Sequence, residues 1–422
     1  MNFENSQKLR TTIEQVLENE SRINEHKPVR YWYPLSLATY GVEEIMEALD
    51  SLCAFRTSMA EKTLQFERSF TKFQGCADSV MVNSGSSADL LLCFLLTNPL
   101  NPLLKRGDEI LMPVVTWPTQ IWSAMMAGLN VKLVDVRPDT LNIDIEDLRK
   151  KITPKTKALF LVHLMGNPCE MDSIINLVKE HKLLLLEDCC EGLGSEWAGT
   201  KVGNFGIGGA FSFFFSHHMT TMEGGMVSCS SNEMAEQLKL LRAHGWLRNV
   251  DVKKYHLNEF PEIDPRYAFV NWGFNLRPTE IQAGFGLRQL EKLPVFNEKR
   301  EKASNRIFGF IEKSKWLSTP TVHAKAKPSW LATPIMLKEN APFKRSELTE
   351  YLEKEGVETR PIVTGNIAKQ PVTRIFKDSF EGHYPGADNI HQNGFYIGLS
   401  PLSTDSDISR LEEVFSKFVS KY

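Results

Sequence analysis

Between residues 79 and 230, short apolar runs of β type alternate with segments in which apolar side chains recur at helical spacing. The apolar runs cover residues 80–82, 109–115, 131–136, 158–164, 183–186, 210–215 and 226–228, and the helical segments cover 87–96, 120–127, 172–181 and 233–242. Strands that alternate with helices predict a largely parallel sheet covered on both faces. Ligands of such sheets collect beyond the carboxyl ends of the strands, so the loops that follow the strands are the candidate sites.

The chain begins with an amphipathic helical pattern over residues 7–24. Its apolar positions, which recur at helical spacing among charges, are Leu9, Ile13, Val16, Leu17 and Ile23. Such a stripe has to cover something, so we expect this helix to lie on its own domain or on a partner subunit. Two more helical patterns follow between residues 42 and 73. We therefore predict a helical extension over residues 1–40, followed by a large domain over residues 41–295.

The pattern changes again near residue 295. A long helical pattern over residues 279–293 meets Pro294, and a charged helix over 297–313 follows the expected break. Beyond it the chain mixes a strand with helices, over residues 330–336, 344–355 and 407–417. This mixture is typical of a smaller α+β domain, which we predict to span residues 296–422.

Composition and charge narrow the function classes. The 422 residues hold 49 basic and 52 acidic side chains, and this balance gives no reason to expect binding to nucleic acid or to an anionic membrane. No apolar run approaches the length of a membrane helix, and the first residues lack the features of a signal peptide, so we expect a cytoplasmic protein. The seven cysteines are scattered without CxC or CxxC spacing. They indicate reduced, mostly buried thiols, with no disulfide framework and no recognisable metal site.

The stretch from Phe211 to Met226 draws attention to a pair of histidines. An apolar strand ends at Ser216, His217 and His218 follow at once, and a Glu-Gly-Gly turn leads into the next strand. Histidines at the end of a buried strand stand where sheet proteins display chemistry, which favours a general base. An ordinary polar loop explains such a pair better when the pair is taken alone. The interpretation therefore depends on the other loops.

Three other strand ends carry residues suited to one cofactor. Gly85, Ser86 and Ser87 open a helix after the first strand and suit a phosphate, although a serine there is often a plain N-cap. Trp117 follows the next strand and can stack on a flat ring, although a tryptophan before a proline often only packs. Asp188, at the mouth of an apolar strand, needs a cation, which is either a protonated ring nitrogen or an arginine.

A phosphate cradle, a stacking ring, a carboxylate for a ring nitrogen and a seryl strand at Ser212 together describe a pyridoxal phosphate site. Each signal is weak alone, and the loop at residues 83–89 matches neither the P-loop nor the dinucleotide fingerprint. The order of these four features along one α/β chain favours a pyridoxal phosphate site.

The same motifs resemble those of the nucleotide-sugar aminotransferases (DegT/DnrJ/EryC1/StrS), a family with the aspartate aminotransferase, type I PLP-dependent fold. The resemblance rests on Asn-Ser-Gly-Ser-Ser-Ala (83–88), Glu-Asp-Cys-Cys-Glu (187–191), Phe-Ser-Phe (211–213), Glu-Gly-Gly (223–225) and Gly-Phe-Asn-Leu-Arg (273–277). It implies an α/β fold with a mostly parallel sheet, and a homodimer that builds its sites at the subunit interface. In such a dimer Asn275 is expected to reach the phosphate of the neighbouring subunit.

One position departs from the pattern of that family. A lysine that holds the cofactor covalently stands there six residues before the glutamate of Glu-Gly-Gly, whereas this chain has His217 and no lysine between Lys201 and Lys239. A histidine at this position resembles the 3-dehydratases of nucleotide-linked 4-keto-6-deoxyhexoses. One kind acts on CDP sugars and adds an iron–sulfur cluster bound by four cysteines, and the other acts on a GDP sugar without a cluster. No cysteine follows Cys229, so the resemblance favours the GDP-linked kind.

The resemblance implies a lyase that uses pyridoxal and pyridoxamine phosphate in deoxysugar and lipopolysaccharide biosynthesis, with glutamate restoring the amine form. We expect His217 to take a proton from the C4′ carbon of the cofactor, while Asp188 keeps the ring nitrogen protonated and the 3-hydroxyl leaves. The other cofactor contacts are assigned to Gly85, Ser86, Ser87, Trp117 and Ser212. Four alternatives stay open: His218 as the base, a CDP-linked substrate, a sugar aminotransferase, and a catalytically silent regulator.

Overall fold

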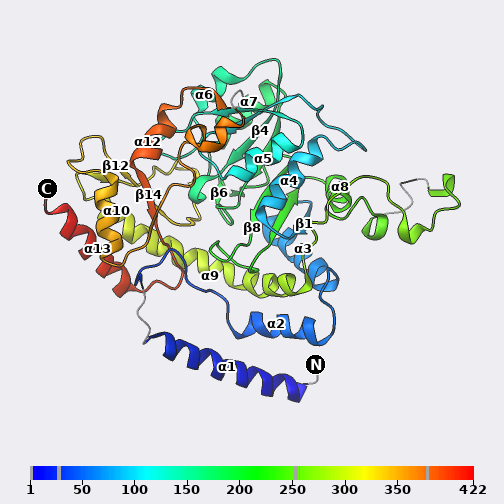
Figure 1. The fold of residues 1–422 in the computed structure, drawn as a ribbon, viewed down its shortest axis with the longest axis horizontal. Helices are drawn as coiled ribbons and strands as arrows, with labels where there is room; N and C mark the ends of the chain where they lie inside the picture. The colour runs from blue at the N-terminus through cyan, green and yellow to red at the C-terminus, as the bar shows by residue number, and fades with distance from the viewer. Residues whose placement is uncertain (1–2, 26–29, 251–254, 256, 377–379) are drawn as a thin grey trace.

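The structure is a computed structural model that describes residues 3–25, 30–250, 255, 257–376 and 380–422 (Figure 1). Its α-helices are α1 (Phe3–Glu25), α2 (Val42–Cys53), α3 (Glu61–Gln74), α4 (Gly85–Leu96), α5 (Pro118–Met126), α6 (Ile145–Lys151), α7 (Met171–Glu180), α8 (Asn232–Arg242), α9 (Glu280–Ile311), α10 (Arg345–Lys354), α12 (Pro385–Asn393) and α13 (Asp405–Val419). Its strands are β1 (Asp78–Val82), β2 (Glu109–Pro113), β3 (Asn130–Val134), β4 (Thr156–Val162), β5 (Leu184–Asp188), β6 (Glu196–Trp197), β7 (Thr200–Lys201), β8 (Gly208–Ser212), β9 (Gly225–Cys229), β10 (Leu317–Ser318), β11 (Ala326–Lys327), β12 (Thr333–Leu337), β13 (Thr359–Pro361) and β14 (Gly394–Ile397).

The largest sheet has seven strands in the order β1-β9-β8-β5-β4-β2-β3. Neighbours pair in parallel, except that β9 runs antiparallel to both β1 and β8. Every strand predicted between residues 79 and 230 is present, so the prediction of a largely parallel sheet is confirmed. Both faces are covered, because alternate side chains of one strand enter different core clusters: Ile110 and Met112 join one cluster and Leu111 joins another.

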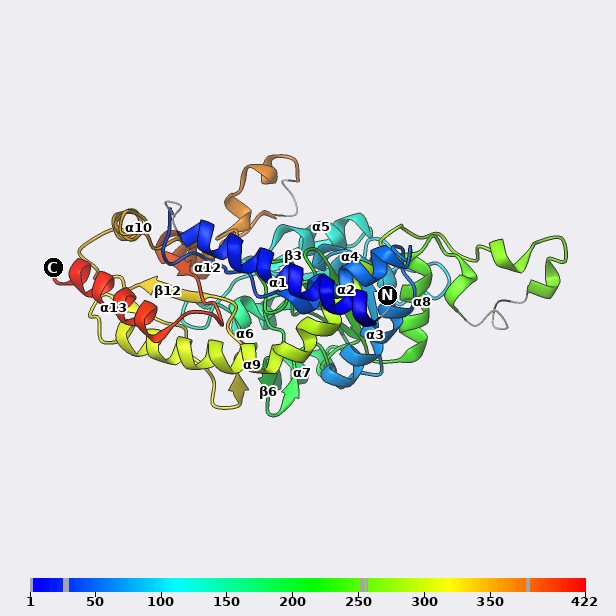
Figure 2. The ribbon, with the colours of Figure 1, turned by 90° about the horizontal axis from the view of Figure 1, so that it is seen from below.

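Helix α9 corrects one prediction. It runs without interruption through Pro294, from the large sheet to the second sheet (Figure 2), so the break predicted at Pro294 is wrong. A proline inside a helix costs about 3 kcal/mol. Burial of Leu293 and Phe296 on either side of it offsets that cost, and a capping box at Thr279 fixes the start of the helix. The domain division near residues 40 and 295 stays a prediction.

The second sheet has four strands, all antiparallel, in the order β10-β12-β14-β13. The predicted strand at residues 330–336 corresponds to β12, and the helices predicted at 344–355 and 407–417 correspond to α10 and α13. A third sheet, β11-β6-β7, joins the two regions of the chain by pairing Ala326 with Trp197. None of the described helices combines the length and the apolar character needed to cross a bilayer.

The amphipathic helix predicted at residues 7–24 is α1, which lies beside α2 (Figure 1). Its contact with α2 includes Arg10, whose Nη1 donates to Glu43 Oε1 at 3.4 Å. Leu9 and Ile13 are half-buried, but Val16 remains 53% exposed. The side chain of Ile23 lies outside the described part of the structure. The helix therefore covers its own chain with only part of its apolar stripe.

A buried ion pair supplies hydrogen-bond partners to the backbone of β1, which lies at the edge of the large sheet. Strand β1 is an edge strand, so Met81 has a backbone N–H and C=O without a strand partner. Oε1 of Glu67 accepts from Met81 N at 2.9 Å, and Nη1 of Arg242 donates both to Met81 O and to Glu67 Oε1 at 2.6 Å. The two charged side chains are 2% and 5% exposed. Helices α3 and α8 are thereby joined to β1.

We expect Arg242→Met to lower the free energy of unfolding by about 3–5 kcal/mol, because it leaves Glu67 buried without a counter-charge. Arg266→Met is the matched control, since Arg266 lies equally close to Asp264, at 2.6 Å, but is 84% exposed. The control is expected to have a much smaller effect, because solvent screens an exposed ion pair. Chemical denaturation of both variants measures the difference, and equal effects would contradict a structural role for the buried pair.

Candidate active site

A cavity of about 530 Å³ lies where the carboxyl ends of the parallel strands meet the second sheet. Its walls come from the first turn of α4, from the loops that follow β2, β5 and β8, and from β13 and β14. Most of the predicted site residues line it: Gly85, Ser86, Trp117, Asp188, Ser212 and His217. Residues more than 130 positions apart in sequence are thus brought to one site, at the edge of the sheet where ligands were expected.

The first turn of α4 forms one corner of the cavity. Ser84 is the N-cap, and its Oγ accepts from Ser87 N at 3.1 Å. The N–H groups of Gly85 and Ser86 precede any helical acceptor, so they remain available to an anion, which the helix dipole also favours. Ser86 Oγ donates to Thr119 Oγ1 at 3.1 Å, which links this corner to α5. The corner therefore suits a phosphate.

Ser87 does not line the cavity, although it was assigned to the phosphate. Its Oγ donates to Asn83 Oδ1 at 2.6 Å and lies 2.9 Å from Ser84 Oγ. The hydroxyl of Ser87 therefore forms its hydrogen bonds within the turn. The N-cap of α4 is Ser84, and not Ser86 or Ser87 as the sequence allowed. The assignment of Ser87 to the phosphate stays a prediction, without support from its side-chain contacts.

Gly85 allows the first turn of α4 to pack closely against the end of β8. A Cβ at this position would lie 2.5 Å from Ser212 Cβ and 3.0 Å from Cys190 Sγ. Only a residue without a side chain lets the helix start come so near to the end of β8. The glycine therefore brings Ser212 beside the free N–H groups of the helix.

His217 presents a basic nitrogen to the cavity. Its Nδ1 lies 2.9 Å from the carbonyl oxygen of Cys190. A carbonyl only accepts, so Nδ1 carries the proton and Nε2 keeps its lone pair. Burial lowers the pKa of His217 to about 4, so the ring is neutral at pH 7. A neutral imidazole with a free Nε2 is the form a general base requires.

His218 points elsewhere. It is completely buried, does not line the cavity, and its Nε2 donates to Ser329 O at 2.8 Å. The loop that carries both histidines is held by Arg300, whose Nη2 donates to the backbone oxygen of His217 at 3.3 Å. Arg300 also donates to the backbone oxygens of Leu331 and Leu399, next to the second sheet. Of the two histidines, only His217 is placed for chemistry in this cavity.

Asp188 lies at the carboxyl end of β5, 4% exposed, and lines the cavity. Its Oδ1 accepts from Cys190 N at 3.0 Å. No lysine or arginine of the described residues forms an ion pair with it, so the arginine that sequence left open as its partner is not found in this part of the chain. Burial raises the pKa of Asp188, and Cys190 and His163 offset this effect only in part, so a cation in the cavity would stabilise the ionised form.

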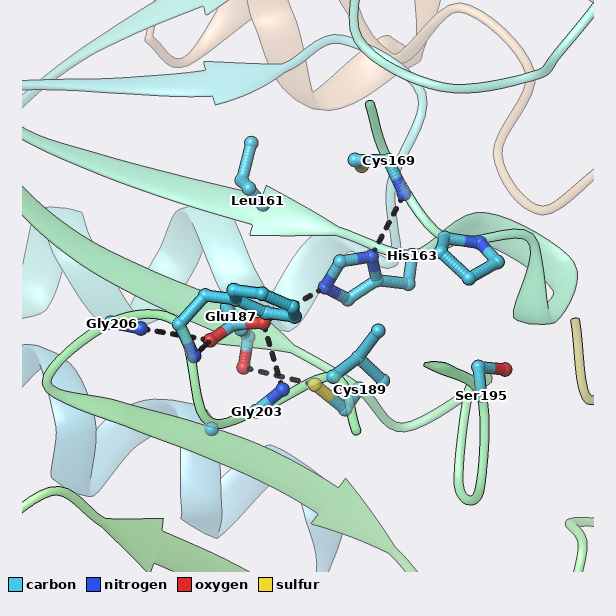
Figure 3. A network of polar contacts seen from close by, with 12 residues as sticks. Leu161, His163, Cys169, Glu187, Cys189, Ser195, Gly203 and Gly206 are labelled. Carbon is cyan, nitrogen blue, oxygen red and sulfur yellow. Dashed lines mark hydrogen bonds and ion pairs between the residues drawn. The ribbon is translucent and has the colours of Figure 1, made fainter. Parts of the chain in front are cut away.

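The residue before Asp188 anchors this strand end. The carboxylate of Glu187 accepts from Gly203 N and Phe205 N at 2.7 Å and from Gly206 N at 3.0 Å (Figure 3). His163, from the end of β4, points at the same carboxylate with Nε2 at 3.1 Å, while its Nδ1 accepts from Cys169 N. All the oxygens and nitrogens of this group are therefore engaged within the chain, which makes it a structural network.

Other residues to which the sequence analysis gave no role also line the cavity, among them Asp89, Glu191, Arg360 and Tyr396. Asp89 had a usable signal, because it is the only charged residue in α4. Glu191 accepts from Met165 N at 2.7 Å, and burial raises its pKa to about 7. The other two come from β13 and β14, and no local pattern could have shown that the second sheet reaches the cavity.

Asn275 does not line the cavity of its own chain. It is exposed, and its Oδ1 accepts from Arg277 Nε at 2.9 Å. This position leaves the expectation of a contact across a dimer interface untested. The seven cysteines are free, and four of them are buried.

Comparison with known proteins gives consistent results. The model of the DegT/DnrJ/EryC1/StrS aminotransferase family matches residues 39–416. The GDP-4-keto-6-deoxy-D-mannose 3-dehydratase of Yersinia pseudotuberculosis is 36% identical over 392 residues, which cover 91% of this chain and 98% of the relative. The structure is also similar to that of the E. coli GDP-4-keto-6-deoxy-D-mannose-3-dehydratase with bound hydrated PLP, with a TM-score of 0.86 and 35% identity over 91% of this chain and 99% of that one.

A second similar solved structure contains an adduct of the cofactor with an amino acid. It is a GDP-4-keto-6-deoxymannose-3-dehydratase with a trapped PLP-glutamate geminal diamine, with a TM-score of 0.83 and 34% identity over 90% of this chain and 99% of that one. These similarities extend over nearly the whole chain and confirm the predicted α/β fold class. The chain therefore belongs to the DegT/DnrJ/EryC1/StrS aminotransferase family.

Proposed function

We propose that the chain is a pyridoxal phosphate-dependent lyase that removes the 3-hydroxyl of a nucleotide-linked 4-keto-6-deoxyhexose, with a GDP-linked sugar as its substrate. One observation carries the proposal. The described lining of the cavity contains no lysine, and a histidine with a free Nε2 faces it. The GDP-4-keto-6-deoxy-D-mannose 3-dehydratases to which the chain is similar support the choice of reaction and of the GDP-linked substrate.

The residues present fit the cofactor. Asp188 is a buried carboxylate without a cation, as a protonated ring nitrogen requires. The free N–H groups of Gly85 and Ser86, with Ser212 beside them, suit the phosphate. Trp117, 57% exposed at the cavity, offers its indole to the ring face. These residues would hold pyridoxal or pyridoxamine phosphate by non-covalent contacts alone.

Bound in its amine form, the cofactor supplies the group that reacts with the sugar ketone and a ring that takes up electron density. His217 would take a proton from C4′ through Nε2, because its Nδ1–H is committed to Cys190 O. Asp188 would keep the ring nitrogen protonated and so favour the movement of electrons towards the ring. The absence of a lysine amine leaves the aldehyde form free, so glutamate can restore the amine form between turnovers.

The mouth of the cavity suits anionic substrates. Arg360 lies there, exposed, with Nη2 2.7 Å from Glu358 Oε1. Its guanidinium can pair with a carboxylate or a phosphate. We assign Arg360 to the binding of both anionic partners, the glutamate and the nucleotide sugar, in turn.

We also propose a cytoplasmic location for the protein.

A homodimer completes the proposal. The segment that follows α8 extends from the body of the molecule at the right of Figures 1 and 2. It exposes large apolar side chains, including Phe260 (51%), Tyr267 (68%) and Phe269 (58%). Apolar side chains in such a position favour association with another protein surface. A second copy of the chain would bury them and bring Asn275 towards the neighbouring phosphate corner.

The direct test is an assay with GDP- and CDP-linked 4-keto-6-deoxyhexoses, pyridoxal phosphate and glutamate. We expect loss of one oxygen from the GDP-linked sugar, together with glutamate-dependent turnover, in the product mass spectrum. A transfer of nitrogen to the sugar would identify an aminotransferase instead. No conversion of bound pyridoxal phosphate by glutamate would favour a catalytically silent regulator.

We expect His217→Asn to lower the single-turnover dehydration rate by about 10² to 10⁴, because general-base catalysis is lost. Cofactor affinity should persist, since the phosphate corner, Trp117 and Asp188 are unchanged. His218→Asn is the control and should cost much less, since His218 lies outside the cavity. Exchange of deuterium from C4′ of pyridoxamine phosphate reports the base directly. Retained exchange in His217→Asn with loss in His218→Asn would assign the base to His218.

We expect borohydride treatment of the protein with pyridoxal phosphate, followed by denaturation, to release the cofactor, because no lysine lines the cavity in the described chain. In the variant His217→Lys the same treatment should leave a phosphopyridoxyl-lysine adduct at residue 217. Mass spectrometry of peptides distinguishes the two results. An adduct on a lysine of the wild-type protein would place the cofactor elsewhere.

A further inference from the structure

Two buried carboxyl groups meet on the wall of the cavity. Asp89 and Asp188 are 2% and 4% exposed. One oxygen of each lies within 4.8 Å of the other and of Cys190 Sγ. Oδ1 of Asp188 accepts from the backbone N–H of Cys190, whereas Oδ1 of Asp89 has no hydrogen-bond partner. The two carboxyl groups therefore differ in how well the chain can support a negative charge on them.

No lysine or arginine in the described part of the chain acts on this pair. The titratable groups of the described residues that interact electrostatically with the two carboxyls are Cys93, Cys189, Cys190, His163 and Glu191. Glu191 is itself a carboxyl and brings no positive charge. His163 is already engaged by Glu187 and Cys169, and thiols carry no positive charge. Burial and the neighbouring Asp188 raise the pKa of Asp89 well above its usual range. Burial also raises the pKa of Asp188, but the N–H of Cys190 stabilises its ionised form.

Two buried carboxyl groups so close together do not both ionise. The proton stays on the carboxyl whose negative charge is less well stabilised by hydrogen bonds. We propose that Asp89 is a positioning residue that stays protonated and donates its proton towards Asp188, so that the pair presents one negative charge to the cofactor. The inference rests on the proposed function, because it takes the ring nitrogen as the cation that Asp188 faces.

A protonated Asp89 has two consequences. As a donor, it supports the carboxylate of Asp188 and so favours the protonated form of the ring nitrogen. As a neutral group, it avoids the excess charge that a second carboxylate would place beside a single cation. An amide at position 89 retains both properties, because it is neutral and donates. An alanine is neutral but cannot donate, so it retains only the second.

The experiment compares Asp89→Asn, Asp89→Ala and Asp188→Asn by the pH dependence of the absorption spectrum of bound pyridoxal phosphate. Asp89→Asn should keep the wild-type spectral transition. Asp89→Ala should move it to lower pH, since the donor is lost, and Asp188→Asn should move it furthest and weaken cofactor binding on the order of tenfold or more. Thermal unfolding of each cofactor-free variant checks that the fold persists.

A second measurement does not need the cofactor. The infrared spectrum of the cofactor-free protein at pH 7 should contain a carbonyl band from protonated Asp89. Asp89→Asn should remove this band and leave the band of Glu191, whose pKa burial raises to about 7. This result would stand even if the protein did not bind pyridoxal phosphate, so it separates the inference from the proposed function.

Three outcomes would overturn the inference. An Asp89→Asn variant that shifts the spectrum as far as Asp188→Asn would show that Asp89 is ionised. An unchanged transition in Asp89→Ala would show that the proton on Asp89 does not act on Asp188. A stoichiometric metal ion that is present in the wild type and lost in Asp89→Asn would show that the two carboxyls and Cys190 form a metal site.

Discussion

The carboxylate of Glu187 is the point on which the geometry of this site depends. A buried charge is tolerated only where the chain supplies enough donors, and here three backbone N–H groups and an imidazole converge on it. Those donors come from the loop before β8 and from the end of β4. The network therefore fixes the end of β5 relative to both neighbouring strands. Asp188 is the next residue, so its position at the cavity is fixed as well.

The site is built from two kinds of contact that act together. The network around Glu187 and the close approach at Gly85 set the phosphate corner and the carboxylate within the large sheet. Arg300 ties the loop of His217 to backbone oxygens next to the second sheet. His217 and Asp188 are thus held at one cavity by separate sets of contacts, although they are distant in sequence.

Sequence patterns predicted most of this arrangement, since the apolar runs, the helical spacing and the strand-end motifs are local. The strands of the large sheet, the cavity residues from Gly85 to His217 and the choice of His217 all follow from such patterns and from the family resemblance. The break at Pro294 was wrong because tertiary burial of Leu293 and Phe296 outweighs a local preference. Ser87 was assigned to the phosphate because hydroxyl residues in a turn look alike until the capping residue is known. Arg360 and Tyr396 could not be placed, because their approach depends on how the second sheet packs.

The loop between β8 and β9 is bound at several points along its length. Phe213 N donates to Gly224 O at 2.8 Å, Thr221 N donates to Phe213 O at 2.9 Å, and Thr220 N donates to Gln289 Oε1 at 3.1 Å. None of these bonds uses the side chain at position 217, whose own hydrogen bond is to Cys190 O. Such a loop resists insertions and deletions but permits exchange of its one functional side chain. Exchange of the side chain at position 217 would therefore change what faces the cavity while the backbone contacts of the loop are retained.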